Sequence, residues 1–166
     1  MSAVNENVLF QVEDDIPENS SSEEIVESRK YLIFITDDLR LGVDAEYVVE
    51  ILNTHTATYL PMMPDYICGI YNMRGQIIPI MDIRRRLGKP PMESENLLVV
   101  LNYNGTQLGI LVDSVEVMLD IPNASILPIP SQSAQKLVSG MCTLPDGSGT
   151  MLVLDCEQLI SHEYGA

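Results

Sequence analysis

The side chains that could do chemistry in this sequence are few and scattered. The segment Ser133-Ala134-Gln135-Lys136 has the S-x-x-K spacing of serine acyl enzymes, but their companion motifs are absent and the segment falls in a polar loop. His55 and His162 stand alone, without a second ligand at metal spacing. Gly88-Lys89 is followed by proline, so it does not form a phosphate-binding loop. The sequence therefore predicts a protein that is not an enzyme and that has no metal or cofactor site.

The three cysteines indicate a reducing compartment. Cys68, Cys142 and Cys156 are odd in number, lie far apart and lack both C-x-x-C and zinc-ligand spacing. We expect them to act as small apolar core residues. The N-terminus has no basic region followed by an apolar run, and no stretch is long and apolar enough to cross a bilayer. The sequence thus predicts a cytoplasmic protein that does not insert into the membrane.

Charge restricts the class of partner. The 166 residues suit one domain with a mostly aliphatic core, and the net charge of −15 argues against sequence-independent binding to nucleic acid or to anionic lipid. Residues 1–28 carry eight acidic side chains and no basic one, which predicts a flexible acidic tail ahead of a folded domain over residues 29–166. The partners should be proteins or small molecules.

One basic cluster stands out in this acidic chain. Arg84-Arg85-Arg86 and Lys89 fall at the end of a short predicted helix. We interpret the cluster as the solvated face of that helix, balanced by the acidic tail. A weaker alternative is a docking surface for an acidic partner, whose binding would fall steeply with salt.

The chain from Tyr31 onward contains the same pattern twice. Gly42 and Gly109 are 67 positions apart, and the same offset matches apolar residues on both sides of them. The offset grows to 71 at Gly69 and Gly140 and to 73 at Asp82 and Asp155, as expected if loops of the second copy are longer. The two halves therefore span about 31–90 and 97–160.

Within each half, short strands alternate with turns. Apolar runs over 31–36 and 97–101 predict strands, Arg74-Gly75 predicts the turn of a hairpin, and Asp82 and Asp155 predict helix starts. The pattern leaves open whether residues 48–52 form a helix or a strand. Pro79 should lie on an edge strand or at a bulge because it cannot donate to a ladder. The expected fold is mainly β, with two small barrels that share an apolar interface.

Several strings resemble the CheW family of chemotaxis adaptors. The most specific is Asn72-Met73-Arg74-Gly75-Gln76-Ile77-Ile78-Pro79-Ile80-Met81-Asp82-Ile83, and Gly109-Ile110-Leu111-Val112-Asp113 and Ile126-Leu127-Pro128-Ile129-Pro130 follow in the right order. The resemblance runs from about Tyr31 to Ile160. It implies two five-stranded Src-homology-3-like barrels packed together, with short helices that include one at the C-terminus.

The same resemblance implies a scaffold without chemistry of its own. Members of this family bridge the cytoplasmic helices of methyl-accepting chemoreceptors to the regulatory domain of the histidine kinase CheA, in membrane-associated receptor arrays. Receptor tips bind in the groove between the barrels, and the opposite barrel end could receive a second kinase or adaptor copy. Two rival functions stay open: the same role in a chemosensory pathway that controls pili or gene expression, and a barrel that binds a small molecule.

The resemblance also implies the partner-binding positions, which are Val48, Glu50, Asn72, Arg74 and Gly75. From the residues alone, an arginine on a hairpin turn is more often a solvated residue, and a glycine there more often supplies a positive φ. Our specific hypothesis is that Glu50 and Arg74 meet as an ion pair at the mouth of a groove, with charged atoms within about 4 Å.

Helix-in-groove recognition of a receptor would need exposed apolar side chains. The sequence offers four candidates for this role, although each is more often a core residue: Met62, Met63, Ile77 and Met118.

Overall fold

The computed structural model describes residues 26–53, 57–90, 97–129 and 137–161. Most of the predicted acidic tail, both histidines and the S-x-x-K segment lie outside these ranges. The described elements are strands β1 (Ser28–Thr36), β2 (Leu39–Asp44), β3 (Val48–Leu52), β4 (Ile67–Met73), β5 (Gln76–Asp82), β6 (Leu97–Tyr103), β7 (Thr106–Val112), β8 (Ser114–Pro122), β9 (Leu127–Pro128), β10 (Val138–Thr143) and β11 (Thr150–Leu154), helices α2 (Ile83–Arg86) and α3 (Cys156–Ser161), and 3-10 turns η1 (Ala45–Tyr47) and η2 (Asn123–Ser125).

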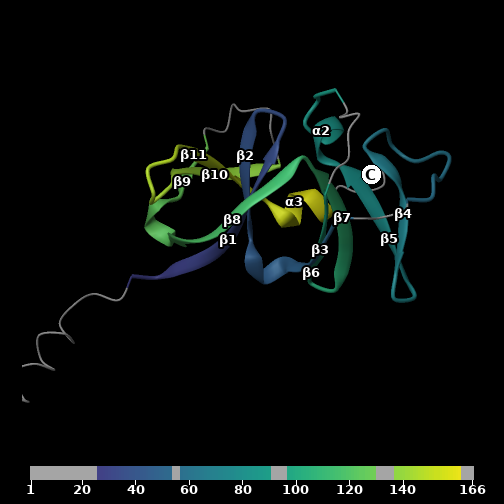
Figure 1. Ribbon diagram of the computed structural model, residues 1–166, viewed down its shortest axis with the longest axis horizontal. Helices are drawn as coiled ribbons and strands as arrows, with labels where there is room; N and C mark the ends of the chain where they lie inside the picture. The colour runs from purple at the N-terminus through teal and green to yellow at the C-terminus, as the bar shows by residue number, and fades with distance from the viewer. Residues whose placement is uncertain (1–25, 54–56, 91–96, 130–136, 162–166) are drawn as a thin grey trace, which may run out of the picture.

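The strands form two sheets that lie side by side, with α3 between them (Figure 1). One sheet has the order β8-β1-β2-β11-β10-β9 and the other β3-β6-β7-β5-β4; we call them barrel A and barrel B. The predicted fold of two small barrels with short helices is confirmed. Neither barrel is one half of the sequence, because β1 and β2 join the second half in barrel A, while β6 and β7 join the first half in barrel B.

The exchange of hairpins is symmetric. In barrel A, Phe34 of β1 pairs with Val115 of β8, and the register shifts next to this pair. In barrel B, the corresponding residues are Leu101 of β6 and Val48 of β3, and the register shifts next to them as well. Each barrel also contains one parallel pairing across the halves, β2 with β11 in barrel A and β5 with β7 in barrel B. The repeat seen in the sequence is therefore a repeat of strand pairing.

The two glycines that first indicated the repeat sit in these parallel ladders. Gly42 pairs with Val153, and Gly109 pairs with Ile80. A Cβ at Gly42 would overlap the Met151 sulfur, and a Cβ at Gly109 would come within 2.8 Å of a methyl carbon of a leucine on β6. Both glycines are needed for close packing inside a barrel rather than for a turn.

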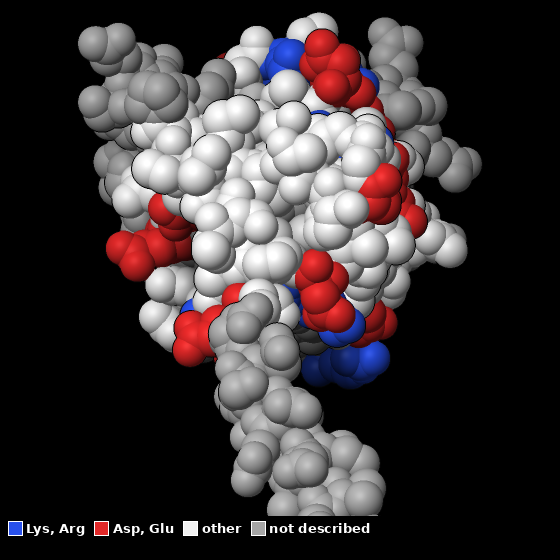
Figure 2. Space-filling model, turned by 90° about the vertical axis from the view of Figure 1, so that its left-hand side faces the viewer, with Lys and Arg blue, Asp and Glu red and all other residues white. Residues whose placement is uncertain are grey.

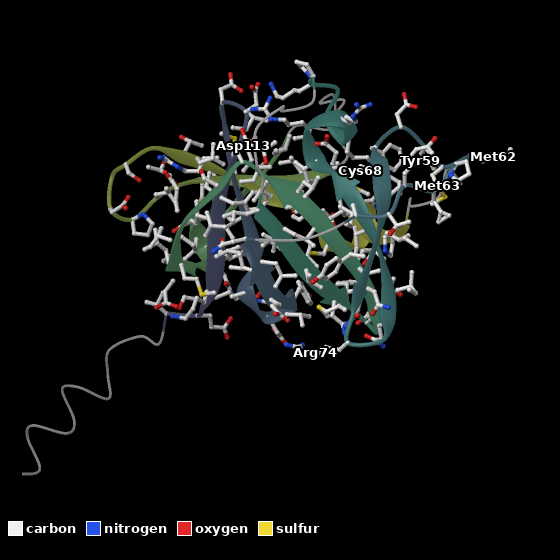
Figure 3. The ribbon with its side chains drawn as sticks, turned by 45° about the vertical axis from the view of Figure 1, so that its right-hand side comes forward. Tyr59, Met62, Met63, Cys68, Arg74 and Asp113 are labelled. Atoms are coloured by element: carbon white, nitrogen blue, oxygen red, sulfur yellow. The ribbon has the colours of Figure 1, made fainter. Side chains whose placement is uncertain are left out.

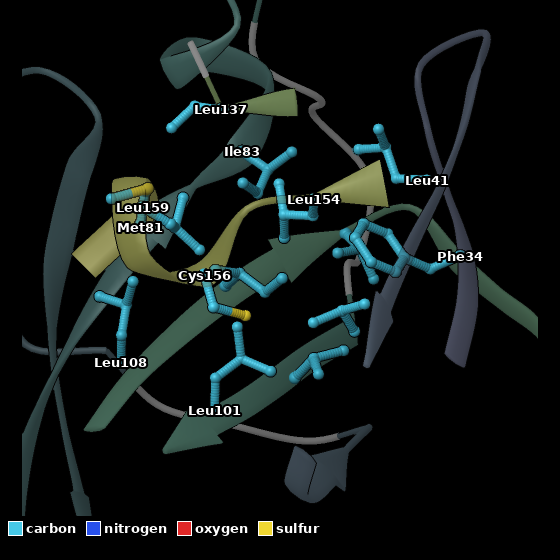
Figure 4. Packing of buried hydrophobic residues seen from close by; sticks show 14 of the residues in the cluster. Phe34, Leu41, Met81, Ile83, Leu101, Leu108, Leu137, Leu154, Cys156 and Leu159 are labelled. Carbon is cyan, nitrogen blue, oxygen red and sulfur yellow. The ribbon is translucent and has the colours of Figure 1, made fainter. Parts of the chain in front are cut away.

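The largest buried cluster lies between the barrels (Figure 4). Phe34 and Leu41 reach it from barrel A, Leu101 reaches it from barrel B, and Leu159 reaches it from α3. Two smaller clusters fill the interiors of barrel A and barrel B separately. Because the largest cluster belongs to both barrels, they should unfold together.

Local signals in the sequence formed the expected elements. Asp82 caps α2 by accepting the backbone N–H of Arg84 at 3.0 Å, and Gly88 follows the helix with a φ of 80°. Asp155 starts α3 by accepting the backbone N–H of Gln158 at 3.1 Å. Residues 48–52, whose type the pattern left open, form strand β3. These caps are local hydrogen bonds, which is why the sequence predicted them.

The prediction for Pro79 was wrong. Its strand β5 lies between β7 and β4, and Pro79 is opposite Ile70 without a bulge at that pair. Ile70 uses its own N–H and C=O for Thr58, at 2.9 and 2.8 Å, so it requires no donor from Pro79. The ladder to β7 begins one residue later, at Ile80. An interior strand thus accepts proline where neither neighbour needs its N–H.

The shared cluster leads to a stability prediction. Leu101→Ala should lower the free energy of unfolding by about 2–5 kcal/mol because it leaves a cavity between the barrels. Chemical denaturation followed by both circular dichroism and tyrosine fluorescence measures this change. Ile77→Ala, at a side chain that is 60% exposed, is the control and should change stability far less. Two separate transitions for the Leu101→Ala protein would contradict a shared core.

Candidate functional site

The β4–β5 hairpin fixes the position of Arg74. Met73 and Gln76 close the hairpin, and the two residues between them have positive φ, 53° for Arg74 and 88° for Gly75. A two-residue turn with both φ values positive matches the right-handed twist of the strands. Glycine takes this conformation without strain, whereas arginine does not. The turn therefore holds Arg74 at the tip of the hairpin.

Asn72 and Gly75 have a structural role in this turn. The Asn72 side-chain oxygen accepts the backbone N–H of Gly75 at 2.9 Å. The β6–β7 turn repeats this contact, since the Asn102 oxygen accepts the N–H of Gly105 at 3.0 Å. Turn chemistry thus accounts for both residues, and the side chain of Asn72 remains exposed.

Glu50 meets Arg74 across the open end of barrel B. Glu50 pairs with Val100, whose side chain belongs to the interior cluster of that barrel, and Met73 borders the same cluster. An Arg74 guanidinium nitrogen lies 3.1 Å from a Glu50 carboxylate oxygen. The Glu50 side chain is 29% exposed and that of Arg74 is 74% exposed. The predicted ion pair is confirmed, whereas its place at the mouth of a groove stays a prediction.

Apolar side chains are exposed on the strands that carry this ion pair. Val49 and Ile51 flank Glu50 on β3, and Ile77 follows the hairpin turn on β5. Val48 is only partly exposed because it packs against the cluster between the barrels. An exposed charged pair on strands with exposed apolar side chains is the composition expected of a surface that binds another protein.

A second apolar feature projects from the other end of barrel B. Met62 is 99% exposed, with a φ of 67°, and Tyr59 is 75% exposed. Figure 3 shows both far from Arg74. Met63, also predicted to be exposed, packs against the shared cluster and lines a hollow of about 470 Å³ together with Cys68. The sequence did not predict the exposure of Tyr59, because nothing in its local pattern distinguishes it from a core aromatic.

Barrel A has an apolar surface of its own. The end of the molecule on the side of β9 and β10 has a broad uncharged centre, with acidic and basic groups nearer its rim (Figure 2). Exposed apolar side chains on β8, β9 and β10 include Met118, which the sequence proposed, and Val117, Leu127 and Met141, which it did not. Each barrel therefore offers exposed apolar side chains for a partner.

A hollow of about 200 Å³ lies where both barrels meet α3. Tyr31, Tyr47 and Tyr103 line it, and the rings of Tyr47 and Tyr103 meet edge to face with centroids 5.1 Å apart. The Tyr103 hydroxyl donates to a Glu157 carboxylate oxygen at 3.1 Å, and this bond is the main reason that its pKa is raised. The hollow combines aromatic faces with the Glu157 carboxylate and the Arg29–Asp44 ion pair, at the seam between the barrels.

The basic cluster is not a solvated helix face, so that interpretation was wrong. The Arg84 guanidinium forms a fork on the Asp113 carboxylate, with a shortest N–O distance of 2.6 Å, and its side chain is only 14% exposed. Arg85 lies 3.6 Å from Asp82. Arg86 stacks over an aromatic ring, with its guanidinium carbon 4.9 Å from the centroid of Tyr66. Tertiary contacts occupy Arg84 and Arg86, and Arg85 alone is exposed with a local contact to Asp82, which leaves a poor docking surface for an acidic partner.

The cysteines are core residues, as predicted. Cys142 and Cys156 are buried and Cys68 is partly buried, and all three are free. Burial raises the pKa of Cys68 to about 11 and that of Cys156 to about 12. Because the thiolate is the reactive form, neither residue is a nucleophile at neutral pH.

In the described ranges, no group of three or more histidine, cysteine or acidic side chains is arranged to hold a metal ion. In the same ranges, no helix is long and apolar enough to cross a membrane.

Comparison with known proteins covers both barrels. The profile of the CheW-like domain family matches residues 30–164. The chain is 30% identical over 140 residues to the chemotaxis protein CheW of Klebsiella aerogenes, which covers 81% of this chain and 83% of that protein. It is 31% identical over 116 residues to the protein FrzA of Myxococcus xanthus, covering 69% and 72%. The crystal structure of the scaffolding protein TtCheW from Thermoanaerobacter tengcongensis superposes with a TM-score of 0.72 at 26% identity, covering 78% of this chain and 90% of that one.

The raised thiol pKa values lead to a prediction about reactivity. At pH 8 only a minor fraction of Cys68 is thiolate, so the folded protein should react slowly with a thiol-specific disulfide reagent, and the rate should rise as the pH approaches 11. Denaturant should expose all three thiols at once. The Cys68→Ala protein is the control and should lose the slow phase seen in the folded state. Rapid reaction of one thiol per folded chain at pH 7 would contradict this account.

Proposed function

The chain belongs to the CheW-like domain family and is a chemotaxis scaffold, and on this premise we propose that it couples chemoreceptors to the histidine kinase CheA. Its partners would be the cytoplasmic helices of methyl-accepting chemoreceptors and the regulatory domain of the kinase. The protein would act in the cytoplasm, recruited to membrane-associated receptor arrays. Its mechanism would be binding alone, without a catalytic step.

The observation that carries this proposal is the Glu50–Arg74 ion pair at the mouth of barrel B. The hairpin turn holds Arg74 in place, so little side-chain and backbone freedom is lost when a partner binds there. Exposed Val49, Ile51 and Ile77 on the same strands offer apolar contact area. Arginine beside apolar side chains is the composition of many binding hot spots. We assign the kinase to this end of barrel B, with Val48, Glu50, Asn72, Arg74 and Gly75 as its site.

We assign the receptor helices to the seam between the barrels. The tyrosines around the hollow offer flat apolar faces, and Glu157 offers a carboxylate to a basic side chain of the receptor, whereas Asp44 is already paired with Arg29 at 2.9 Å. An amphipathic helix would present its apolar side chains at helical spacing to such a seam. The uncharged end of barrel A would remain for a second kinase or a second scaffold copy. Several modest affinities then add through multivalency as an array forms.

Binding measurements with an Arg74 variant test this function. We expect the protein to bind both a chemoreceptor cytoplasmic fragment and a CheA regulatory domain, and we expect Arg74→Ala to weaken kinase binding by about tenfold because the loss of a hot-spot arginine typically costs more than 1 kcal/mol. Calorimetric titration measures both affinities, and circular dichroism verifies the fold.

The matched control is Lys30→Ala. Lys30 forms an exposed ion pair with Asp120 on barrel A at 3.4 Å, so this variant removes a similar surface charge away from the assigned site. It should leave kinase binding unchanged. If the wild-type protein bound neither partner at micromolar concentration, the coupling function would be wrong for this chain. If Lys30→Ala weakened binding as much as Arg74→Ala, the site would be wrong.

A further inference from the structure

The ion pairs around Arg84 join the two barrels. Within the described ranges, the other ion pairs link elements of one barrel, such as Arg40 with Glu116 in barrel A and Arg74 with Glu50 in barrel B. Arg84 lies in α2, which continues directly from β5 of barrel B, and Lys89 lies just after this helix. Both side chains nevertheless contact Asp37 in the β1–β2 turn of barrel A. Figure 1 shows this turn beside α2 at the top of the molecule.

The Arg84 contact has the geometry of a specific fork. Its Nε donates to one Asp113 oxygen at 3.0 Å, and its Nη2 donates to the other at 2.6 Å. Its Nη1 lies 3.3 Å from an Asp37 carboxylate oxygen. The Arg84 and Asp113 side chains are only 14% and 11% exposed. A planar, two-bond contact of this kind fixes orientation as well as distance, which a single ammonium group cannot do.

Asp113 occupies the point where the chain passes from one barrel to the other. It lies between the end of β7 in barrel B and the start of β8 in barrel A. Its carboxylate also accepts the backbone N–H of Asp37 at 2.7 Å, and its own N–H donates to the Ile35 carbonyl at 2.9 Å. Lys89 closes the contact from outside, with its Nζ 3.1 Å from Asp37. We call Arg84, Asp113, Asp37 and Lys89 the latch.

Among the described residues, the other end of the seam has no equivalent of the latch. The offset of 73 positions that relates Asp82 to Asp155 places Glu157 at the position of Arg84. There, in the part of the chain that the structure describes, the link is the hydrogen bond from Tyr103 to Glu157, beside the hollow of about 200 Å³. Turn η1, which contains Tyr47 of this hollow, lies low in Figure 1, away from α2. The seam is thus held by ion pairs at the end near α2 and has a hollow at the end near η1.

We propose that Arg84 is a positioning residue whose fork on Asp113 sets the orientation of the two barrels, and thereby the width of the hollow at the opposite end of the seam. The apolar cluster between the barrels holds them together, but hydrophobic contact is non-directional and does not fix rotation by itself. A partner that contacts both barrels therefore depends on Arg84 without touching it. This inference rests on the proposed binding of receptor helices in the seam.

The test compares two arginines with the same chemistry. Arg84→Lys keeps the charge, removes the fork on Asp113 and removes the Nη1 contact with Asp37 that crosses between the barrels. Arg40→Lys does the same to the fork on Glu116, which has bonds of 2.8 and 3.2 Å within barrel A. The double variant Arg84→Gln/Asp113→Asn removes both charges of the latch, so it leaves no unpaired buried carboxylate that could prevent folding. Circular dichroism and thermal melts verify that each full-length protein is folded.

Two measurements report on the latch. Hydrogen exchange followed by mass spectrometry should show faster exchange in peptides that contain the Asp37 and Asp113 amides, and also in η1 and Tyr103 across the seam, for both Arg84 variants. Affinity for the chemoreceptor fragment should fall by about fivefold or more, a typical size for coupling between distant sites. Arg40→Lys should change neither the exchange at η1 nor the affinity.

Each outcome decides a separate claim. Unchanged exchange at η1 and Tyr103 in the folded Arg84 variants would overturn the latch, whatever the binding results. Equal effects of Arg40→Lys and Arg84→Lys on exchange at η1 would also overturn it, since general destabilisation would then explain both. Failure of the wild-type protein to bind the receptor fragment would overturn the proposed function, while the exchange data would still test whether Arg84 orients the barrels.

Discussion

The parallel pairings between the two sequence halves are the constraint on which the rest of this structure depends. In barrel B, β5 pairs with β7, and in barrel A, β2 pairs with β11. Each barrel is completed by a hairpin from the other half, so neither half can bury its apolar side chains alone. The exchange draws Phe34, Leu41 and Leu101 into one cluster, and α3 covers it. A scaffold made in this way has two barrel ends and one shared core.

The same topology determines what each end can offer. Barrel B has an ion pair between β3 and the β4–β5 hairpin. The register shift of β3 leaves Val49 unpaired, and the corresponding shift of β8 in barrel A leaves Glu116 unpaired. Glu116 then pairs with Arg40 inside its own barrel, and apolar side chains are left on the outer strands. The two ends therefore present different chemistry at their surfaces.

The basic side chains in the described ranges are engaged in contacts within the protein. Each lysine and arginine in the described ranges forms an ion pair, except Arg86, which stacks on Tyr66. The remaining surface charge is acidic, in keeping with the net charge of −15. Such a surface repels nucleic acid and anionic lipid, so recognition must come from apolar side chains and from a few placed charges.

Features that depend on neighbours along the chain were determined by the sequence. The hairpin at Arg74-Gly75, the helix starts at Asp82 and Asp155 and the repeat of strands follow from turn chemistry, capping and hydrophobic spacing, all of which act over a few residues. The pairing of Glu50 with Arg74 was inferred from the family resemblance, because the spacing of these residues alone does not indicate it.

Only the tertiary structure decided which strands pair, because the two halves carry similar apolar patterns and either hairpin suits either barrel. It also placed Pro79 in an interior strand and Arg84 against Asp113. Both outcomes depend on partners far away in sequence, whose positions are set when the barrels close, and no local pattern records them.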